Sequence, residues 1–103
     1  MSSMRQLMKQ AQEMQERLQR ELAETIVEAS VGGGMVSVRM TAKMEVKAVK
    51  IDPSLIKVDE REILEDLLVT AHNDARRKAE AAMQEKMASL TGGLGLPPGL
   101  GLG

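Results

Sequence analysis

The apolar residues of this chain change their spacing twice along the sequence, and this change limits the folds that the chain can form. Residues 4–23 and 59–90 place apolar residues three and four positions apart, which is typical of amphipathic helices. Between them, residues 25–31, 35–41 and 45–51 are short segments rich in β-branched residues, as strands are. The sequence therefore predicts an α+β domain in which one helix precedes three strands and a long helix follows them.

Turn residues separate these segments. Residues 32–34 are three glycines between the first two strands, and glycine supplies the φ values that a hairpin turn needs. The third strand stops at a turn that contains Pro53. Asp59 followed by Glu62 has the spacing of a capping box, which predicts the start of the second helix. Strands joined by such hairpins form an antiparallel sheet.

The end of the chain differs in composition from the rest. Residues 92–103 contain only Gly, Leu and Pro, without a period that a helix or a strand could use. We predict a flexible tail there and one domain in residues 1–91. A domain of this size buries only about two thirds of its unfolded surface, so association with a second copy would add to its stability.

Helix length predicts how the elements are arranged. The two helices are about 30 Å and about 48 Å long at 1.5 Å per residue, whereas the strands span only about 20 Å. Both helices must overhang the sheet, and apolar residues continue into the overhang. These are Met4, Leu7 and Met8 in the first helix and Met83 and Met87 in the second. We expect the free ends to pair as an antiparallel arm, and two copies to bury the exposed sheet face in a homodimer.

Composition excludes several kinds of site. The chain has no Cys, which rules out disulfides, thiolate metal ligands and Cys nucleophiles, and no Phe, Trp or Tyr on which nucleic-acid bases could stack. His72 is the only histidine, and no partner for catalysis or metal binding accompanies it. We expect no enzymatic activity, small-molecule substrate, cofactor or metal. No apolar run approaches the roughly 18 residues that span a bilayer, so we expect a cytoplasmic location and no membrane contact.

Several short segments together resemble the YbaB/EbfC family of small bacterial nucleoid-associated proteins. They are Ile51-Asp52-Pro53-Ser54-Leu55, Leu64-Glu65-Asp66-Leu67, Asn73-Asp74-Ala75-Arg76-Arg77, Glu85-Lys86-Met87-Ala88-Ser89, the opening Met8-Lys9-Gln10-Ala11-Gln12 and the closing Leu96-Pro97-Pro98-Gly99. The resemblance implies a compact homodimer that binds double-stranded DNA with low sequence preference and has no catalytic activity. The chain departs from the family at residues 41–44, where relatives often carry an Asn or Gly turn.

Charge is unevenly distributed, although the formal net charge is only -1. Residues 1–11 hold two basic side chains and no acidic one, and residues 76–91 hold four basic against two acidic side chains. Residues 52–75 hold two basic against seven acidic side chains. The predicted arm is therefore positive while the start of the second helix is negative, and DNA responds to local potential rather than to net charge.

The basic residues of the arm have two interpretations. As DNA-binding residues they would contact phosphates, and the candidates are Arg5, Lys9, Arg76, Arg77, Lys78 and Lys86. As solvated helix faces they would form ion pairs four residues apart. Those pairs would be Lys9–Glu13, Glu13–Arg17, Glu16–Arg20, Asp74–Lys78 and Arg76–Glu80. Arg5 and Lys86 have no acidic residue three or four positions away, which makes them the strongest phosphate candidates.

Two functions fit these patterns. The first is a nucleoid-associated protein that binds the DNA backbone with low sequence specificity and influences chromosome organisation and gene expression. The second is a protein-interaction adaptor that uses Met-lined arms, with Met8 and Met83, and the Leu-rich tail. No helix-turn-helix, zinc-finger or basic-zipper pattern is present, so strong sequence specificity is not expected.

Overall fold

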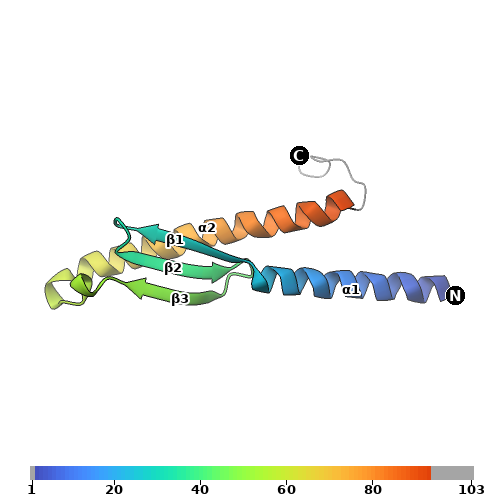
Figure 1. Cartoon of the computed structure of the whole chain (residues 1–103), viewed down its shortest axis with the longest axis horizontal. Coiled ribbons are helices and arrows are strands. Elements are labelled where there is room, and N and C mark those ends of the chain that lie inside the picture. Colours follow the sequence, from blue (N-terminus) through green and yellow to red (C-terminus); the bar gives the residue numbers. More distant parts are fainter. Residues whose placement is uncertain (1, 94–103) are drawn as a thin grey trace.

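Two helices project from the same end of a three-stranded antiparallel sheet (Figure 1). The computed structural model describes residues 2–93. Its elements are α1 (Ser2–Glu24), β1 (Ile26–Val31), β2 (Val36–Thr41), β3 (Val46–Ile51), the short 3-10 helices η1 (Pro53–Leu55) and η2 (Val58–Glu60), and α2 (Arg61–Gly93). The sheet order is β1-β2-β3, with both neighbouring pairs antiparallel. The predicted order of helices and strands is confirmed.

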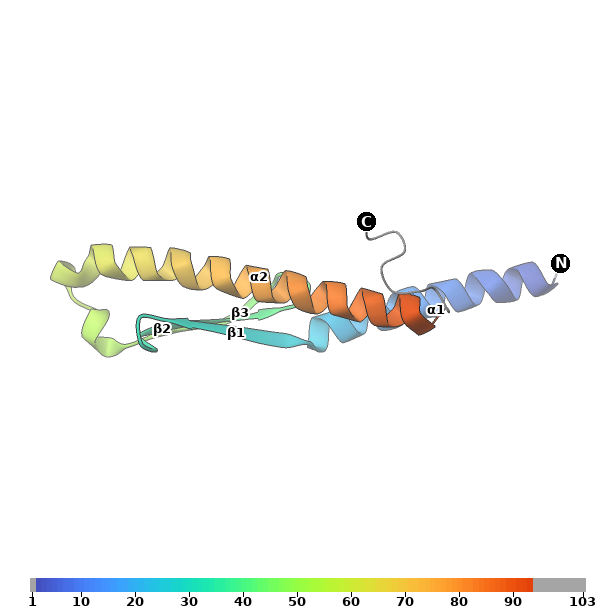
Figure 2. The ribbon, with the colours of Figure 1, turned by 90° about the horizontal axis from the view of Figure 1, so that it is seen from above.

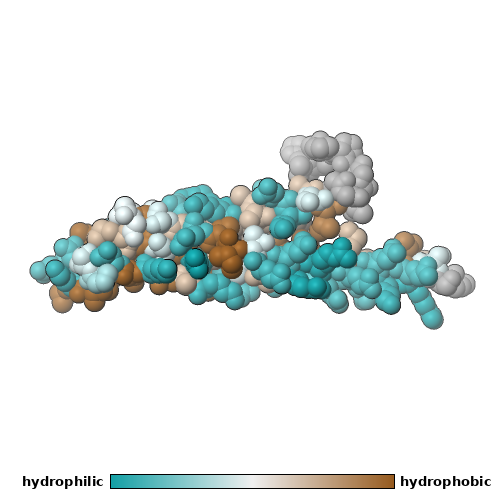
Figure 3. Space-filling view, in the orientation of Figure 1, coloured by the Kyte–Doolittle hydropathy of each residue, from teal (hydrophilic) through white to brown (hydrophobic). Residues whose placement is uncertain are grey.

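The molecule is long and thin because α1 leaves the sheet while α2 runs back past it. Its principal extents are 68 × 28 × 15 Å. Seen from above, α2 crosses the whole sheet and continues beside α1 (Figure 2). Hydrophilic side chains cover most of α1 on the visible face (Figure 3). The predicted overhang of both helices is therefore confirmed.

The first hairpin follows from its glycines. Gly32, Gly33 and Gly34 have φ angles of 63°, 68° and 91°, in the left-handed region that glycine adopts at low cost. The register on either side is regular, with Val31 opposite Val36. The predicted glycine turn is confirmed.

The second hairpin turn is held by hydrogen bonds to a side chain and contains no glycine. The Thr41 hydroxyl accepts hydrogen bonds from the backbone N–H groups of Lys43 and Glu45, both at 3.2 Å. Met44 adopts a φ of 70° there. This conformation strains a residue that has a Cβ atom. Thr41 is 1% exposed, so its polar group is buried inside the turn that it holds.

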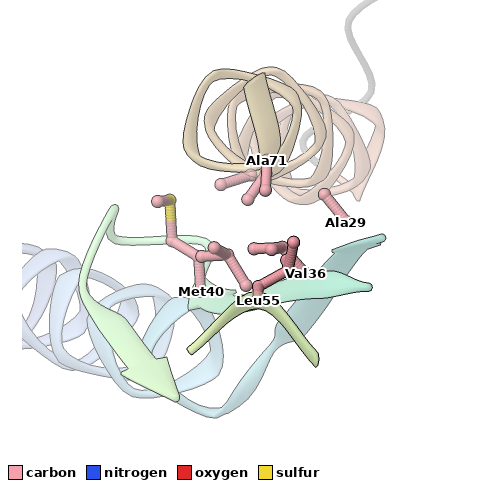
Figure 4. Close-up of a cluster of buried hydrophobic side chains, with 8 residues drawn as sticks. Ala29, Val36, Met40, Leu55 and Ala71 are labelled. Carbon is pink, nitrogen blue, oxygen red and sulfur yellow. The ribbon is translucent and has the colours of Figure 1, made fainter. Parts of the chain in front are cut away.

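Helix α2 packs on β1 and β2 through its smallest side chains. Ala71, Ala75 and Ala79 are spaced four residues apart and are completely buried. Figure 4 shows Ala71 pointing toward Val36 and Met40 of the sheet. Because alanine is small, the helix lies close to the strands, and a larger residue would force them apart. The predicted apolar stripe of this helix is confirmed where it crosses the sheet.

The apolar stripe of α1 becomes more exposed with distance from the sheet. Leu22 is 4% exposed and Leu18 is half-buried. Met4, Leu7 and Met8 are 65%, 63% and 63% exposed. Although α1 and α2 contact each other, the two ribbons separate toward their ends (Figure 1). The free ends of the two helices were predicted to pair as an antiparallel arm, but at the tip of α1 these apolar side chains stay exposed.

The predicted start of α2 needs a correction. Asp59 lies inside η2, and no side-chain hydrogen bond of Asp59 is found in residues 2–93, so it does not cap a helix that starts there. A side-chain cap occurs earlier, where the Asp52 carboxylate accepts a hydrogen bond from the Ser54 N–H at 2.9 Å. At the other end, the helix continues to Gly93, two residues into the predicted tail. Residues 94–103 of that tail lie outside the described residues.

Candidate nucleic-acid interface

The basic residues of α1 are exposed and unpaired. Within residues 2–93, no ion pair shorter than 4.0 Å involves a side chain of α1. Arg5 and Lys9 therefore present free charges on the exposed surface of the helix. The predicted α1 pairs between Lys9 and Glu13, Glu13 and Arg17, and Glu16 and Arg20 are not formed. Long side chains on a solvated helix lose conformational entropy when they pair, and water screens the attraction that would compensate.

The consecutive basic residues of α2 all have partners. Arg76 pairs with Glu80 at 3.2 Å, which confirms that predicted pair. Arg77 pairs with Asp74, one turn earlier. The Lys78 ammonium donates a hydrogen bond to a backbone carbonyl of β1, the Glu28 oxygen, at 2.8 Å. The predicted pair between Asp74 and Lys78 is therefore wrong, because tertiary structure offers Lys78 a better acceptor.

Helix geometry prevents these three residues from acting as one patch. Consecutive residues on an α-helix point about 100° apart, so Arg76, Arg77 and Lys78 face three directions. Lys78 is turned toward the sheet by its hydrogen bond. Lys86 continues the helix face of Ala75 and Ala79, but it lies nearer the end of α2 and is half-buried. Within residues 2–93 it has no ion pair.

The sequence-predicted candidates therefore divide into two groups. Arg5, Lys9 and Lys86 are free cations on the projecting helices. Arg76, Arg77 and Lys78 are held by partners near the sheet. Sequence reasoning missed this division, since the acceptor for Lys78 lies 50 residues away along the chain. No local pattern could have revealed that contact.

The opposite end of the molecule is acidic. Glu62, Glu65 and Asp66 lie exposed in the first turns of α2, and only Glu65 has a basic neighbour, Arg61 at 4.0 Å. His72 lies exposed on the same helix. Within the described part of the chain, no group of three or more His, Cys, Asp or Glu side chains could hold a metal ion. The far ends of the two projecting helices are positive by contrast, because residues 1–11 hold two basic and no acidic side chains and residues 76–91 hold four basic and two acidic ones.

The hydropathy of the two long helices differs from that of a membrane-spanning helix. Neither of the helices described in residues 2–93 has an apolar segment long enough to span a bilayer.

The model of the YbaB/EbfC DNA-binding family matches residues 1–94 of this chain. The chain belongs to the YbaB/EbfC family. Two similar proteins are both named nucleoid-associated proteins. One from Rhodopseudomonas palustris strain TIE-1 is 68% identical over 100 residues, and one from Nitrobacter hamburgensis is 70% identical over 100 residues. Each match covers 94% of both chains.

A solved structure of similar fold supports the arrangement of the elements. The crystal structure of the uncharacterised protein HP0035 from Helicobacter pylori has a TM-score of 0.74 and 25% identity. The match covers 88% of this chain and 96% of that one. The family is one of DNA-binding proteins, which agrees with the excess of basic side chains at the far ends of the two projecting helices.

Proposed function

We propose that the protein binds duplex DNA in the bacterial nucleoid, mainly through the phosphate backbone and with low sequence specificity. The observation that supports this proposal most directly is that Arg5, Lys9 and Lys86, in a member of a DNA-binding family, have no ion pair within residues 2–93 and lie on the projecting helices. Binding at many sites would influence chromosome organisation and gene expression. The names of the two similar proteins support a nucleoid location in the cytoplasm.

Backbone contact fits the side chains that the arm offers. Arg5, Lys9 and Lys86 carry charges that bind phosphates without distinguishing bases. The chain contains no Phe, Trp or Tyr ring on which bases could stack. Because phosphates are the same at every site, such a surface binds unrelated duplexes with similar affinity.

The two groups of cations would have different roles. The free residues Arg5, Lys9 and Lys86 would contact phosphates directly. Arg76 and Arg77 have exposed ion pairs, which are worth little in water, so each could exchange its carboxylate for a phosphate at small cost. Lys78 would have to leave its backbone acceptor, so we propose that it contributes least.

A homodimer would bind DNA more tightly than a single chain with one arm. Each protomer offers one arm, and two arms joined through a body bind a duplex more tightly than either arm alone, because the second contact is intramolecular. We propose that the functional unit is this homodimer.

Fluorescence anisotropy with several unrelated DNA duplexes across a salt series tests the proposal. We expect similar affinities for all duplexes, a steep loss with salt, and much weaker binding by the double variant Arg5→Glu with Lys86→Glu. The double variant Lys47→Glu with Lys50→Glu is the matched control, because both lysines are exposed on β3 and neither has an ion pair within the described residues. Absence of binding at low salt, or equal loss in the control, would rule out an arm-mediated backbone contact.

One observation favours the alternative function as a protein-interaction adaptor. Met4, Leu7 and Met8 form an exposed apolar stripe at the tip of α1, and methionine suits varied partner surfaces. In this case Met8→Glu would abolish partner binding while duplex affinity stays unchanged. Pull-down from cell extract with Met8→Glu and with Arg5→Glu separates the two functions. Retention of all partners by Met8→Glu would exclude the adaptor function.

A further inference from the structure

The exposed methionines of residues 2–93 all lie on the projecting helices. Met4 and Met8 of α1 are 65% and 63% exposed, and Met87 of α2 is 49% exposed. Met40 of the sheet is 1% exposed and belongs to the core beneath α2 (Figure 4). The remaining methionines of this range are half-buried, and they are Met14, Met35, Met44 and Met83. A small reagent in solution therefore reaches methionine sulfur on the helices more easily than in the sheet.

Met8 lies beside a cation that the proposed function assigns to DNA. On an α-helix, residues three and four positions apart are neighbours, with Cβ atoms about 5–6 Å apart. Within α1, Arg5 is three positions before Met8, and Met4 is four positions before it. Side chains on a helix lean toward its N-terminus, so the Met8 side chain extends over the turn that carries Arg5. Both side chains are long enough for the Met8 sulfur and the Arg5 guanidinium to meet.

Methionine sulfur reacts with hydrogen peroxide without the help of a catalytic group. The sulfur donates an electron pair to one oxygen of the peroxide, and the O–O bond breaks. The proton of the transferred hydroxyl passes to the leaving hydroxide, so the products are methionine sulfoxide and water. The sulfur is oxidised by two electrons and the peroxide is reduced by two. Because the peroxide must reach the sulfur, exposed Met4, Met8 and Met87 react before buried Met40.

Oxidation changes what the sulfur offers to Arg5. A thioether is a weak hydrogen-bond acceptor, whereas a sulfoxide is polar and its oxygen is a good acceptor. The Arg5 guanidinium has five N–H donors and no ion pair within residues 2–93, so it is free to donate to that oxygen. A guanidinium that donates to the sulfoxide has fewer donors for a phosphate. The negative end of the S–O dipole also repels a phosphate that approaches Arg5.

We propose that Met8, with Met4 one turn before it, is a peroxide-sensitive modification site whose sulfoxide weakens DNA binding through Arg5. The inference rests on the proposed function, because it takes Arg5 as a phosphate contact. The modification is reversible, since methionine sulfoxide reductases return the sulfoxide to methionine. Burial of Met40 protects the sheet, so oxidation lowers the DNA affinity while the fold is kept.

Mass spectrometry of peptides, after treatment of the whole chain with graded doses of hydrogen peroxide, tests the site. We expect sulfoxide at Met4, Met8 and Met87 at doses that leave Met40 unoxidised. Far-ultraviolet circular dichroism should show the same helix content before and after these doses. Oxidation of Met40 at the same dose as Met8 would overturn the assignment, because the sheet would then be as accessible as the helices.

Fluorescence anisotropy with a DNA duplex tests the coupling to Arg5. Loss of one phosphate contact is worth about eightfold at about 0.1 M salt, which is the upper limit for each arm. Partial loss of that contact should lower the affinity by about threefold or more after oxidation. Treatment with methionine sulfoxide reductases of both epimer specificities should restore it. The double variant Met4→Leu with Met8→Leu is the control, because leucine keeps the helix propensity and has no sulfur to oxidise.

Two comparisons separate an effect through Arg5 from a general effect of peroxide. Arg5→Gln should lose no further affinity on oxidation, because the group that donates to the sulfoxide is gone. Met8→Gln places a polar acceptor at this position without peroxide, so it should bind DNA more weakly than Met8→Leu. Equal oxidative loss in Arg5→Gln or in the leucine double variant would overturn the coupling, as would equal affinities of Met8→Gln and Met8→Leu.

The same titrations distinguish this inference from the proposed function. An unoxidised chain that binds no duplex at low salt would refute the proposed function and, with it, the coupling. An unoxidised chain that binds, and whose affinity is unchanged once Met4 and Met8 are sulfoxides, would refute the modification site alone.

Discussion

Replacement of Arg5 by glutamine tests whether a free cation on α1 contacts a phosphate. Arg5 is exposed, and within residues 2–93 it has neither an ion pair nor a side-chain hydrogen bond. Glutamine keeps the helix propensity and removes only the charge. We therefore expect unchanged stability and weaker DNA binding.

The size of the effect follows from counterion release. Each phosphate contact contributes a slope of about 0.9 to the dependence of log affinity on log salt, so at about 0.1 M salt one contact is worth about eightfold in affinity. If a dimer places both arms on one duplex, Arg5→Gln removes two contacts. The affinity then falls about 60-fold and the slope by about 1.8. If only one arm binds, the losses are about eightfold and about 0.9.

Anisotropy titrations across a salt series measure both quantities. Lys50→Gln is the control, because it removes one exposed positive charge from the sheet rather than from the arm. We expect its slope to match that of the unchanged protein. A slope for Arg5→Gln equal to that of the control would show that Arg5 makes no phosphate contact.

Three further predictions concern the fold. Gly33→Ala should lower the free energy of unfolding by about 1 kcal/mol, because the positive φ strains alanine although no atom lies close to its Cβ. Gly32→Ala should lower it by about 2 kcal/mol, because its Cβ would in addition lie 3.1 Å from a methyl group of Leu67 in α2. Urea unfolding followed by circular dichroism at fixed protein concentration compares them, and equal costs would contradict the close approach. Lys78→Met should cost about 1 kcal/mol in the same assay by removing the bond to Glu28, whereas no loss would show that the bond is not stabilising. Hydrogen bonds from the Ser54 side chain and the Ser54 backbone N–H lower the pKa of Asp52. The contribution of this carboxylate to stability is therefore present at neutral pH and is lost as the pH falls below the usual carboxyl pKa of 3.8. The difference in stability from Asp52→Ala should narrow on acidification, and a constant difference would refute this.

Local patterns predicted most of the fold correctly. The apolar spacing of residues 4–23 and 59–90 and the three strand segments placed every long element within three residues of its ends. The glycines of residues 32–34 predicted a turn because few other residues adopt their φ angles. Each of these signals arises from neighbouring residues, so one sequence was sufficient.

The features that the sequence did not predict depend mainly on contacts between distant segments. Helix α2 covers β1 and β2 and leaves Val49 exposed, which the strand pattern of residues 45–51 did not predict. The role of Lys78 is set by a carbonyl of β1. Asp59 does not cap α2, because it lies within the 3-10 helix η2, which precedes Arg61. The exposure of Val49 and the contact of Lys78 both depend on segments far apart in the chain, and residue spacing contains no information about such contacts.

The separation of charges explains why a protein of net charge -1 can present a positive surface. Glu62 and Lys86 lie on one helix, 24 residues apart, which at 1.5 Å per residue is about 36 Å. At physiological salt the screening length is about 8 Å, so the acidic start of α2 has almost no influence on the potential at Lys86. A duplex that approaches the arm therefore encounters the local cations, and the length of α2 is what keeps the two ends electrostatically independent.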